Sequence, residues 1–231
     1  MLGTLAILTT ANVLNNRVAP RLAPLTSATA TVALIGLARR SGLSWRELGF
    51  ERGRRGALLG AALTLGGVVP VYAVGVVWPR TRPLFLDKRA LSLSRARLAE
   101  EILLQVPIGT VLLEEVGFRG VVHGLVARSH GRAAATAVSS ALFGLWHVLP
   151  ALDMARANSA LSGETFIADN QNSAVRRAVG AVAGTVVATA AAGVLLCALR
   201  RRGGLLAPAM LHTATNSLGF FAARIARRLT R

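Results

Sequence analysis

The composition of the 231-residue chain excludes an ordinary soluble domain: 53% of the residues are hydrophobic, only 16% are charged, and the mean hydropathy is +0.51. Soluble chains carry about a quarter charged residues. The formal net charge of +17 raises the question of nucleic-acid binding. The arginines, however, form short groups beside apolar segments, as cations that anchor helices in a bilayer do. We therefore expect the lipid bilayer as a partner and no nucleic acid.

Seven apolar segments approach the length of about 20 residues that a spanning helix needs. They cover residues 2–18, 22–38, 57–78, 98–127, 133–149, 176–199 and 205–223. The pattern predicts an all-α, polytopic transmembrane helix bundle of about seven spans, with residues 1–231 as a single multi-pass domain in the cell membrane. One long polar stretch, from Asp153 to Ser173, is expected to be a surface loop or a lid.

Ionisable side chains in the middle of a spanning helix are costly, so each is a candidate functional residue, and we single out five. They are Glu114, Glu115, Arg119, His147 and His212. Glu115 and Arg119 stand four positions apart, in the order that favours an ion pair on one helical face. Glu114 points about 100° away and has no cation in its own helix, so it is the candidate general base.

Helical arithmetic predicts that these side chains meet. If residues 128–132 form a hairpin turn, Glu114 and His147 both lie on the order of 21 to 23 Å from it. If residues 176–199 cross back, the turn at 200–204 lies on the same side as the hairpin. Asn216 is then nearly level with Glu114, and His212 lies one turn shallower. One carboxylate, two imidazoles and an amide are therefore expected to converge inside the bundle.

Such a group suits more than one kind of chemistry. A carboxylate that removes a proton from water, beside imidazoles that hold a metal or stabilise an oxyanion, suits hydrolysis. The same residues suit a proton relay or an ion site in a transporter, or a structural polar network. The spacing alone leaves these alternatives open.

Other reactive side chains are expected to be structural. His123 falls on the far face of the Glu114 helix, His130 lies in the turn, and Cys197 lies in an apolar run. Pro107 predicts a kink that opens room beside Glu114, because transmembrane helices tolerate proline.

Three motifs follow one another along the second half of the chain. They are Glu114-Glu115-Val-Gly-Phe118-Arg119, Phe143-Gly-Leu-Trp146-His147 and His212-Thr-Ala-Thr-Asn216. They resemble, in order, the E-E-x-x-x-R, F-x-x-x-H and H-x-x-x-N motifs of the CAAX proteases and bacteriocin-processing enzymes. This is the CPBP or Abi family of intramembrane proteases, related to the type II CAAX prenyl endopeptidase. The resemblance covers residues 98–223, the expected catalytic core, whereas residues 1–97 supply N-terminal spans and basic loops.

The resemblance implies a role for each motif residue. Glu114 would activate water, assisted by His147, while His212 and Asn216 would complete a water or metal site and stabilise the oxyanion. Glu115 and Arg119 would shape the site through their own pair. The expected catalytic residues are thus Glu114, Glu115, His147, His212 and Asn216, with Arg119 in support.

The resemblance further implies an intramembrane metalloendopeptidase that acts on a peptide or membrane-protein substrate. The implied cofactor is a divalent metal, with zinc expected, held by Glu114, His147 and His212, and a metal-free Glu/His mechanism is the alternative. Lys88 is the only lysine, which is typical of a GC-rich bacterium, and prenylated substrates are not expected there. The rival interpretation is a non-proteolytic membrane protein, either a proton-coupled transporter or a partner-binding scaffold such as one for bacteriocin self-immunity.

Overall fold

The computed structural model describes residues 1–157 and 171–231, and all of the regular structure in these two ranges is helical. This confirms the all-α expectation. The central part of the expected polar connection, residues 158–170, lies outside the described residues.

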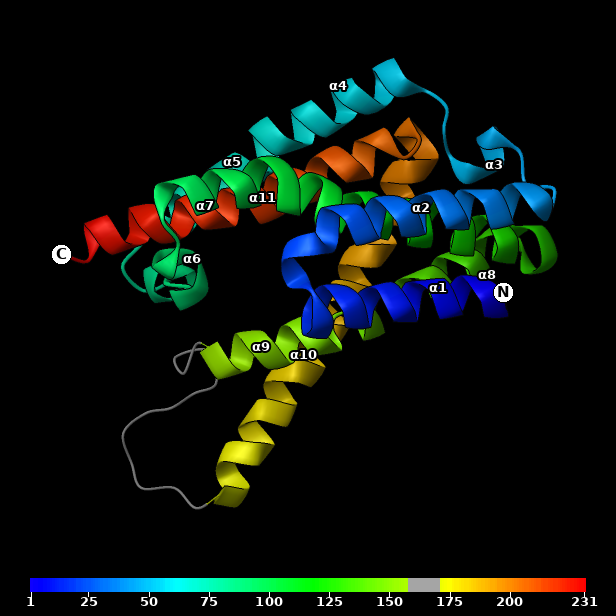
Figure 1. Ribbon diagram of the computed structural model, residues 1–231. Helices are drawn as coiled ribbons and strands as arrows, with labels where there is room; N and C mark the ends of the chain where they lie inside the picture. The colour runs from blue at the N-terminus through cyan, green and yellow to red at the C-terminus, as the bar shows by residue number, and fades with distance from the viewer. Residues whose placement is uncertain (158–170) are drawn as a thin grey trace.

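The N-terminal region forms a helical hairpin. Helix α1 (Leu2–Val13) continues into a short π-helix, η1 (Leu14–Val18), and a 3-10 turn, η2 (Pro20–Leu22), leads into α2 (Ala23–Arg40). Proline in the first turn of η2 and of α2 suits these helix starts, because the first amides of a helix have no partner within it. Helices α1 and α2 lie side by side in Figure 1.

The next helix, α3 (Trp45–Leu48), is one turn long and is fixed by its ends. Ser44 and Glu47 form a capping box at its start, and Gly49, at φ 90°, ends it. The chain then forms a third long segment and two short helices. Their bounds are α4 (Gly53–Leu63), η3 (Thr64–Val68), α5 (Val69–Val77), η4 (Arg82–Phe85) and α6 (Lys88–Ser92).

The expected hairpin is present in the centre of the chain. Its elements are α7 (Arg95–Glu100), η5 (Glu101–Leu112), η6 (Glu115–Val122) and α8 (His123–Trp146). The chain reverses inside α8 at Gly131, whose φ of 79° favours glycine. The two arms are antiparallel, since Ser139 donates a 2.8 Å hydrogen bond to the carbonyl of Phe118. Residues 128–132 therefore form the predicted turn.

The first arm differs from the prediction in its helical type. Both η5 and η6 are π-helices, whereas the sequence arithmetic assumed α-helical geometry. Pro107 lies inside η5, where it removes one backbone donor. π-Helical turns are uncommon and are frequent at functional sites, so the geometry of this arm is consistent with a functional site there.

The C-terminal helices close the bundle. After α9 (Val148–Ala157), α10 (Gln171–Gly203) crosses α8, and α11 (Leu206–Leu229) runs beside α4 and α5 (Figure 1). Gly193 of α10 lies so close to Ser140 that an added Cβ would come within 3.0 Å of its Cα. The turn between α10 and α11 contains Gly204, and the amide of Leu205 donates to the carbonyl of Gly49 at 2.9 Å.

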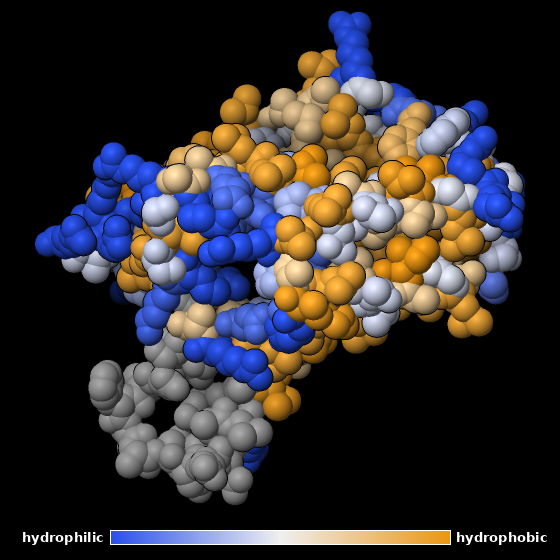
Figure 2. Space-filling model, in the orientation of Figure 1, coloured by the Kyte–Doolittle hydropathy of each residue, from blue (hydrophilic) through white to orange (hydrophobic). Residues whose placement is uncertain are grey.

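The surface is that of a membrane protein. Within the described residues, four helical runs are long and apolar enough to cross a bilayer: Pro20–Arg40, Trp45–Val77, Arg95–Ala157 and Val179–Gly203. The third of these contains two of the expected spans, folded back at Gly131. Figure 2 shows apolar residues over the middle of one face and hydrophilic residues gathered toward its ends. Large apolar side chains such as those of Val32, Leu65 and Leu103 are exposed, as lipid-facing residues are.

Candidate active site

The two adjacent glutamates lie at the centre of the bundle. Glu115 begins η6 and Glu114 immediately precedes it, and both side chains are buried. The hairpin brings the end of α8 against this point, and α11 brings His212 to the same place. The arms that the sequence placed at similar depths therefore do meet.

The carboxylate of Glu115 contacts two basic side chains, those of Arg119 and His212. Its Oε1 accepts from Nη1 of Arg119 at 3.2 Å and lies 2.8 Å from Nδ1 of His212. Arg119 is fully buried, and its guanidinium lies 3.7 Å from the centre of the Phe143 ring. The predicted Glu115–Arg119 pair is thus confirmed, and the same carboxylate oxygen contacts the His212 ring.

Glu114 has one oxygen held and one oxygen free. The indole Nε1 of Trp146 donates to Oε1 at 2.8 Å. Oε2 is buried and has no hydrogen-bond partner among the described residues, and Nε2 of His212 lies 3.6 Å from it. Two polar atoms at this distance can be bridged by a water molecule. A base with one oriented, unengaged oxygen is the arrangement that proton abstraction requires.

His147 directly follows Trp146 in the chain and forms no hydrogen bond to either glutamate in the described part of the chain. Its Nδ1 is 2.7 Å from the carbonyl of Phe143, and its ring packs edge-on against the Phe143 ring at 4.6 Å. A carbonyl oxygen accepts only, so Nδ1 carries the proton in this contact. The sequence placed His147 level with Glu114, but the preceding residue, Trp146, makes the contact.

Asn216 lies one turn beyond His212 on α11. It lines a cavity of about 480 Å³ together with Tyr72 and Thr110, and within the described residues its side chain forms no hydrogen bond to Glu114, Glu115 or His147. The phenolic hydroxyl of Tyr72 donates to the carbonyl of Thr215 at 2.9 Å, which ties α5 to this part of α11. Asn216 therefore lies at the wall of this cavity, one helical turn from the histidine that contacts Glu115.

Two supporting residues were missed from the sequence. The signal for Trp146 is that the N–H of a buried indole needs an acceptor, and Glu114 is expected at a similar depth. Asn12 of α1 donates to the carbonyl of Trp146 at 2.9 Å, so the first helix supports the site. The signal for Asn12 was its polarity within an apolar run.

Comparison with known proteins identifies the family. Residues 100–218, just over half of the chain, match the type II CAAX prenyl endopeptidase Rce1-like family. The chain belongs to this family. No curated protein and no solved structure gives a match. The Rce1-like region includes all six of the expected site residues, Glu114, Glu115, Arg119, His147, His212 and Asn216, and its helices are those of a membrane protein.

The fit of this Rce1-like site to a metal can be tested on its donors. A catalytic zinc site has three protein ligands and one open position. Among the described residues, no three His, Cys, Asp or Glu side chains converge as a metal requires. Of the expected ligands, Glu114 and His212 approach each other, whereas Nδ1 of His147 is engaged with a carbonyl. The donors as arranged do not fit a three-ligand site, and the zinc expectation stays a prediction.

The two histidines expected to be structural differ from each other in this Rce1-like chain. His130 is exposed in the turn, with Nδ1 2.7 Å from the hydroxyl of Ser129. His123 is 2% exposed, and neither of its ring nitrogens has a hydrogen-bond partner among the described residues.

Proposed function

We propose that this Rce1-like chain is an intramembrane endopeptidase that hydrolyses a peptide bond with a water molecule activated by Glu114. The observation that supports this proposal is the buried, unengaged Oε2 of Glu114, 3.6 Å from Nε2 of His212. Family membership supports the same class of reaction.

In the proposed reaction, Glu114 removes one proton from water while the water oxygen attacks the carbonyl carbon of the substrate. The hydrogen bond from Trp146 holds the carboxylate in place. The contact between Nδ1 of His212 and Glu115 leaves Nε2 of His212 to accept the second hydrogen of the water. Glu114 then returns its proton to the leaving nitrogen, the C–N bond breaks, and the products are a carboxylic acid and an amine.

The remaining residues stabilise charge and geometry in this proposal. Asn216 supplies a side-chain N–H for the developing oxyanion from the cavity wall, and His147 assists proton transfer. Arg119 compensates Glu115, so that the buried site carries one uncompensated carboxylate, that of Glu114. No step of this mechanism passes through a metal.

Two cavities offer room for a substrate on either side of α11. The cavity beside Asn216 has a partly polar lining that includes Glu101 and Thr110. A second cavity of about 580 Å³ is lined almost entirely by apolar side chains, including Pro107, Val111 and Met210. Residues 111–112, which border this second cavity, end two positions before Glu114, and residues 213–214, which also border it, directly follow His212. A peptide with an apolar attachment or a membrane-embedded segment suits this pair.

The proposal is tested with protein purified in detergent. Wild type, Glu114→Gln and Glu100→Gln are incubated with quenched peptides and with a prenylated C-terminal peptide. Glu100 is the matched control, because it lies on the same helical run and forms a surface pair with Arg97. We expect wild type and Glu100→Gln to cleave alike, and Glu114→Gln to be slower by about 10²- to 10⁴-fold.

The result also separates the rival function. Equal cleavage by Glu114→Gln and wild type would remove Glu114 from the reaction. If neither protein cleaves any peptide, and reconstituted wild type carries a proton flux that Glu114→Gln lacks, the buried carboxylate serves transport instead of hydrolysis.

A further inference from the structure

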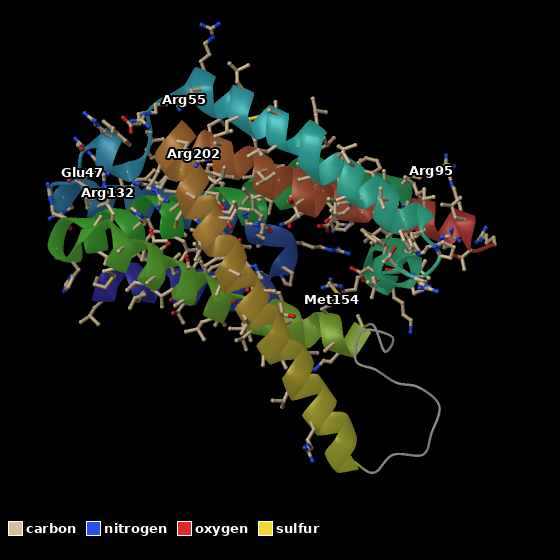
Figure 3. All side chains as sticks on the ribbon, turned by 180° about the vertical axis from the view of Figure 1, so that it is seen from behind. Glu47, Arg55, Arg95, Arg132, Met154 and Arg202 are labelled. Atoms are coloured by element: carbon tan, nitrogen blue, oxygen red, sulfur yellow. The ribbon has the colours of Figure 1, made fainter. Side chains whose placement is uncertain are left out.

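A second polar cavity lies where three loops meet, away from the glutamates. It has a volume of about 320 Å³ and is bordered by α3, by the hairpin turn and by the end of α10. Glu47 joins these elements: its Oε1 lies 3.4 Å from Nε of Arg128 in the hairpin, and its carbonyl accepts from Nη2 of Arg200. Figure 3 shows Glu47, Arg132 and Arg202 at this end of the bundle and Arg95 at the other end. The cavity is thus separate from the proposed active site.

The lining of this cavity has a strong excess of positive charge. Two glutamates, Glu47 and Glu51, face six arginines, which are Arg46, Arg52, Arg128, Arg132, Arg200 and Arg201.

Both glutamates are already paired. Glu51 lies within 3.7 Å of Arg46 and Arg52, and Glu47 pairs with Arg128. Among the described residues, Arg132 and Arg201 form no ion pair, and Nε of Arg200 is buried without a hydrogen-bond partner. Within the described structure, three guanidinium groups around this cavity are therefore left without an anionic partner.

His123 gives an independent sign that the cavity is built for a ligand. Its side chain lines the cavity and is 2% exposed, yet both ring nitrogens lack hydrogen-bond partners in the described residues. Buried polar groups in folded proteins are nearly always paired, because an unpaired one costs free energy. The ring of His123 offers one donor and one acceptor beside arginines that lack an anion. A ligand with negatively charged oxygens and a hydroxyl group would pair with all of these side chains.

We propose that this cavity binds a phosphate group. Phosphate presents several oxygens that guanidinium groups bind in pairs of parallel hydrogen bonds, and Arg132, Arg200 and Arg201 offer such donors. A protonated or monoester phosphate also reaches His123 as donor or acceptor. The cavity lies at one end of the helices, beside loops that carry exposed arginines, so the same chemistry is available from soluble phosphate and from the headgroup of an anionic lipid. The proposal does not depend on the proposed peptidase activity.

The test compares three proteins in two settings. The site variant is Arg132→Gln/Arg201→Gln, in which both side chains are exposed and removal of their charge leaves the core unchanged. The matched control is Arg54→Gln/Arg55→Gln, which removes the same charge from two exposed residues outside the cavity lining. Figure 3 shows Arg55 at the same end of the bundle. Binding of inorganic phosphate in detergent is measured by calorimetry. Thermal unfolding is measured in nanodiscs of phosphatidylcholine alone or mixed with phosphatidic acid.

We expect the site variant to bind phosphate about tenfold more weakly than wild type and control, as the loss of charge-assisted hydrogen bonds implies. A difference seen with inorganic phosphate assigns the site to a soluble anion. A difference seen only with phosphatidic acid assigns it to a lipid headgroup.

The proposal is overturned if the site variant binds as wild type does, or if the control loses as much affinity, because charge alone would then account for binding. It is also overturned if wild type responds to neither ligand, in which case the cavity holds water. His123→Leu provides a second check: it should retain the fold and lose the stabilisation that phosphate gives to wild type.

Discussion

His212 and Glu115, which are 97 positions apart in the sequence, lie 2.8 Å apart through Nδ1 and Oε1 in the centre of the bundle. This contact links α11 to the hairpin that carries both glutamates. It also decides which nitrogen of His212 faces Glu114, since Nδ1 is occupied and Nε2 lies 3.6 Å from Oε2 of Glu114. Glu115, which is not the base of the proposed reaction, therefore connects the first and third motifs.

The hydrogen bond from Trp146 to Glu114 is expected to contribute to catalysis. In Trp146→Phe the ring stays and the N–H is lost. Because a hydrogen bond to a charged group contributes about 1.5–3 kcal/mol, we expect kcat to fall about 10- to 100-fold with little change in KM. Trp78→Phe, at an exposed position, is the control and should behave as wild type. An unchanged kcat in Trp146→Phe would show that the indole only fills space.

The buried Glu115–Arg119 pair is expected to determine stability. In Arg119→Met the carboxylate of Glu115 is left in the core with His212 as its remaining partner, and the free energy of unfolding should fall by about 3–5 kcal/mol. The double variant Glu115→Gln/Arg119→Met should recover much of this loss, because no unpaired charge remains. Arg97→Met, which breaks a surface pair, should change stability little. Unfolding of the purified proteins in mixed detergent measures these differences. A double variant no more stable than Arg119→Met would contradict this account.

Asn216 is expected to act on the transition state from the cavity wall. Removal of a single oxyanion donor typically lowers kcat by about 10²- to 10³-fold, and we expect Asn216→Ala to follow this pattern. Ser217→Ala, at the next residue, is the control, because within the described residues its hydroxyl donates to the carbonyl of Ile102 and to no residue of the candidate site. A rise in KM with an unchanged kcat would instead assign Asn216 to substrate binding.

Chelation tests the metal expected from the sequence. Because, of the three expected ligands, only Glu114 and His212 approach each other in the described structure, we expect peptidase activity to survive prolonged treatment with a strong zinc chelator. The measurement is cleavage rate and bound metal per chain, before and after treatment. Loss of activity that zinc restores would establish a zinc enzyme in which His147 turns toward Glu114.

The sequence predicted those features of the site that depend on neighbours along one helix. The i, i+4 spacing predicted the Glu115–Arg119 pair, and glycine and arginine at residues 128–132 predicted the reversal. Hydropathy predicted an all-helical membrane protein, since apolar length and composition are properties of the chain itself. Three motifs in order predicted the family that the comparison finds.

Only the tertiary structure decided which side chain contacts which across helices. Depth arithmetic placed His147 beside Glu114, yet Trp146 makes that contact, because depth along a helix does not fix rotation about its axis. The π-helical turns of η5 and η6 add to this uncertainty, since they change the angle between successive residues. His123 shows the same limit: its sequence position suggested a structural role, and only the meeting of three loops places it in a basic cavity. Composition and periodicity act locally, whereas the packing of distant helices depends on all of their side chains together.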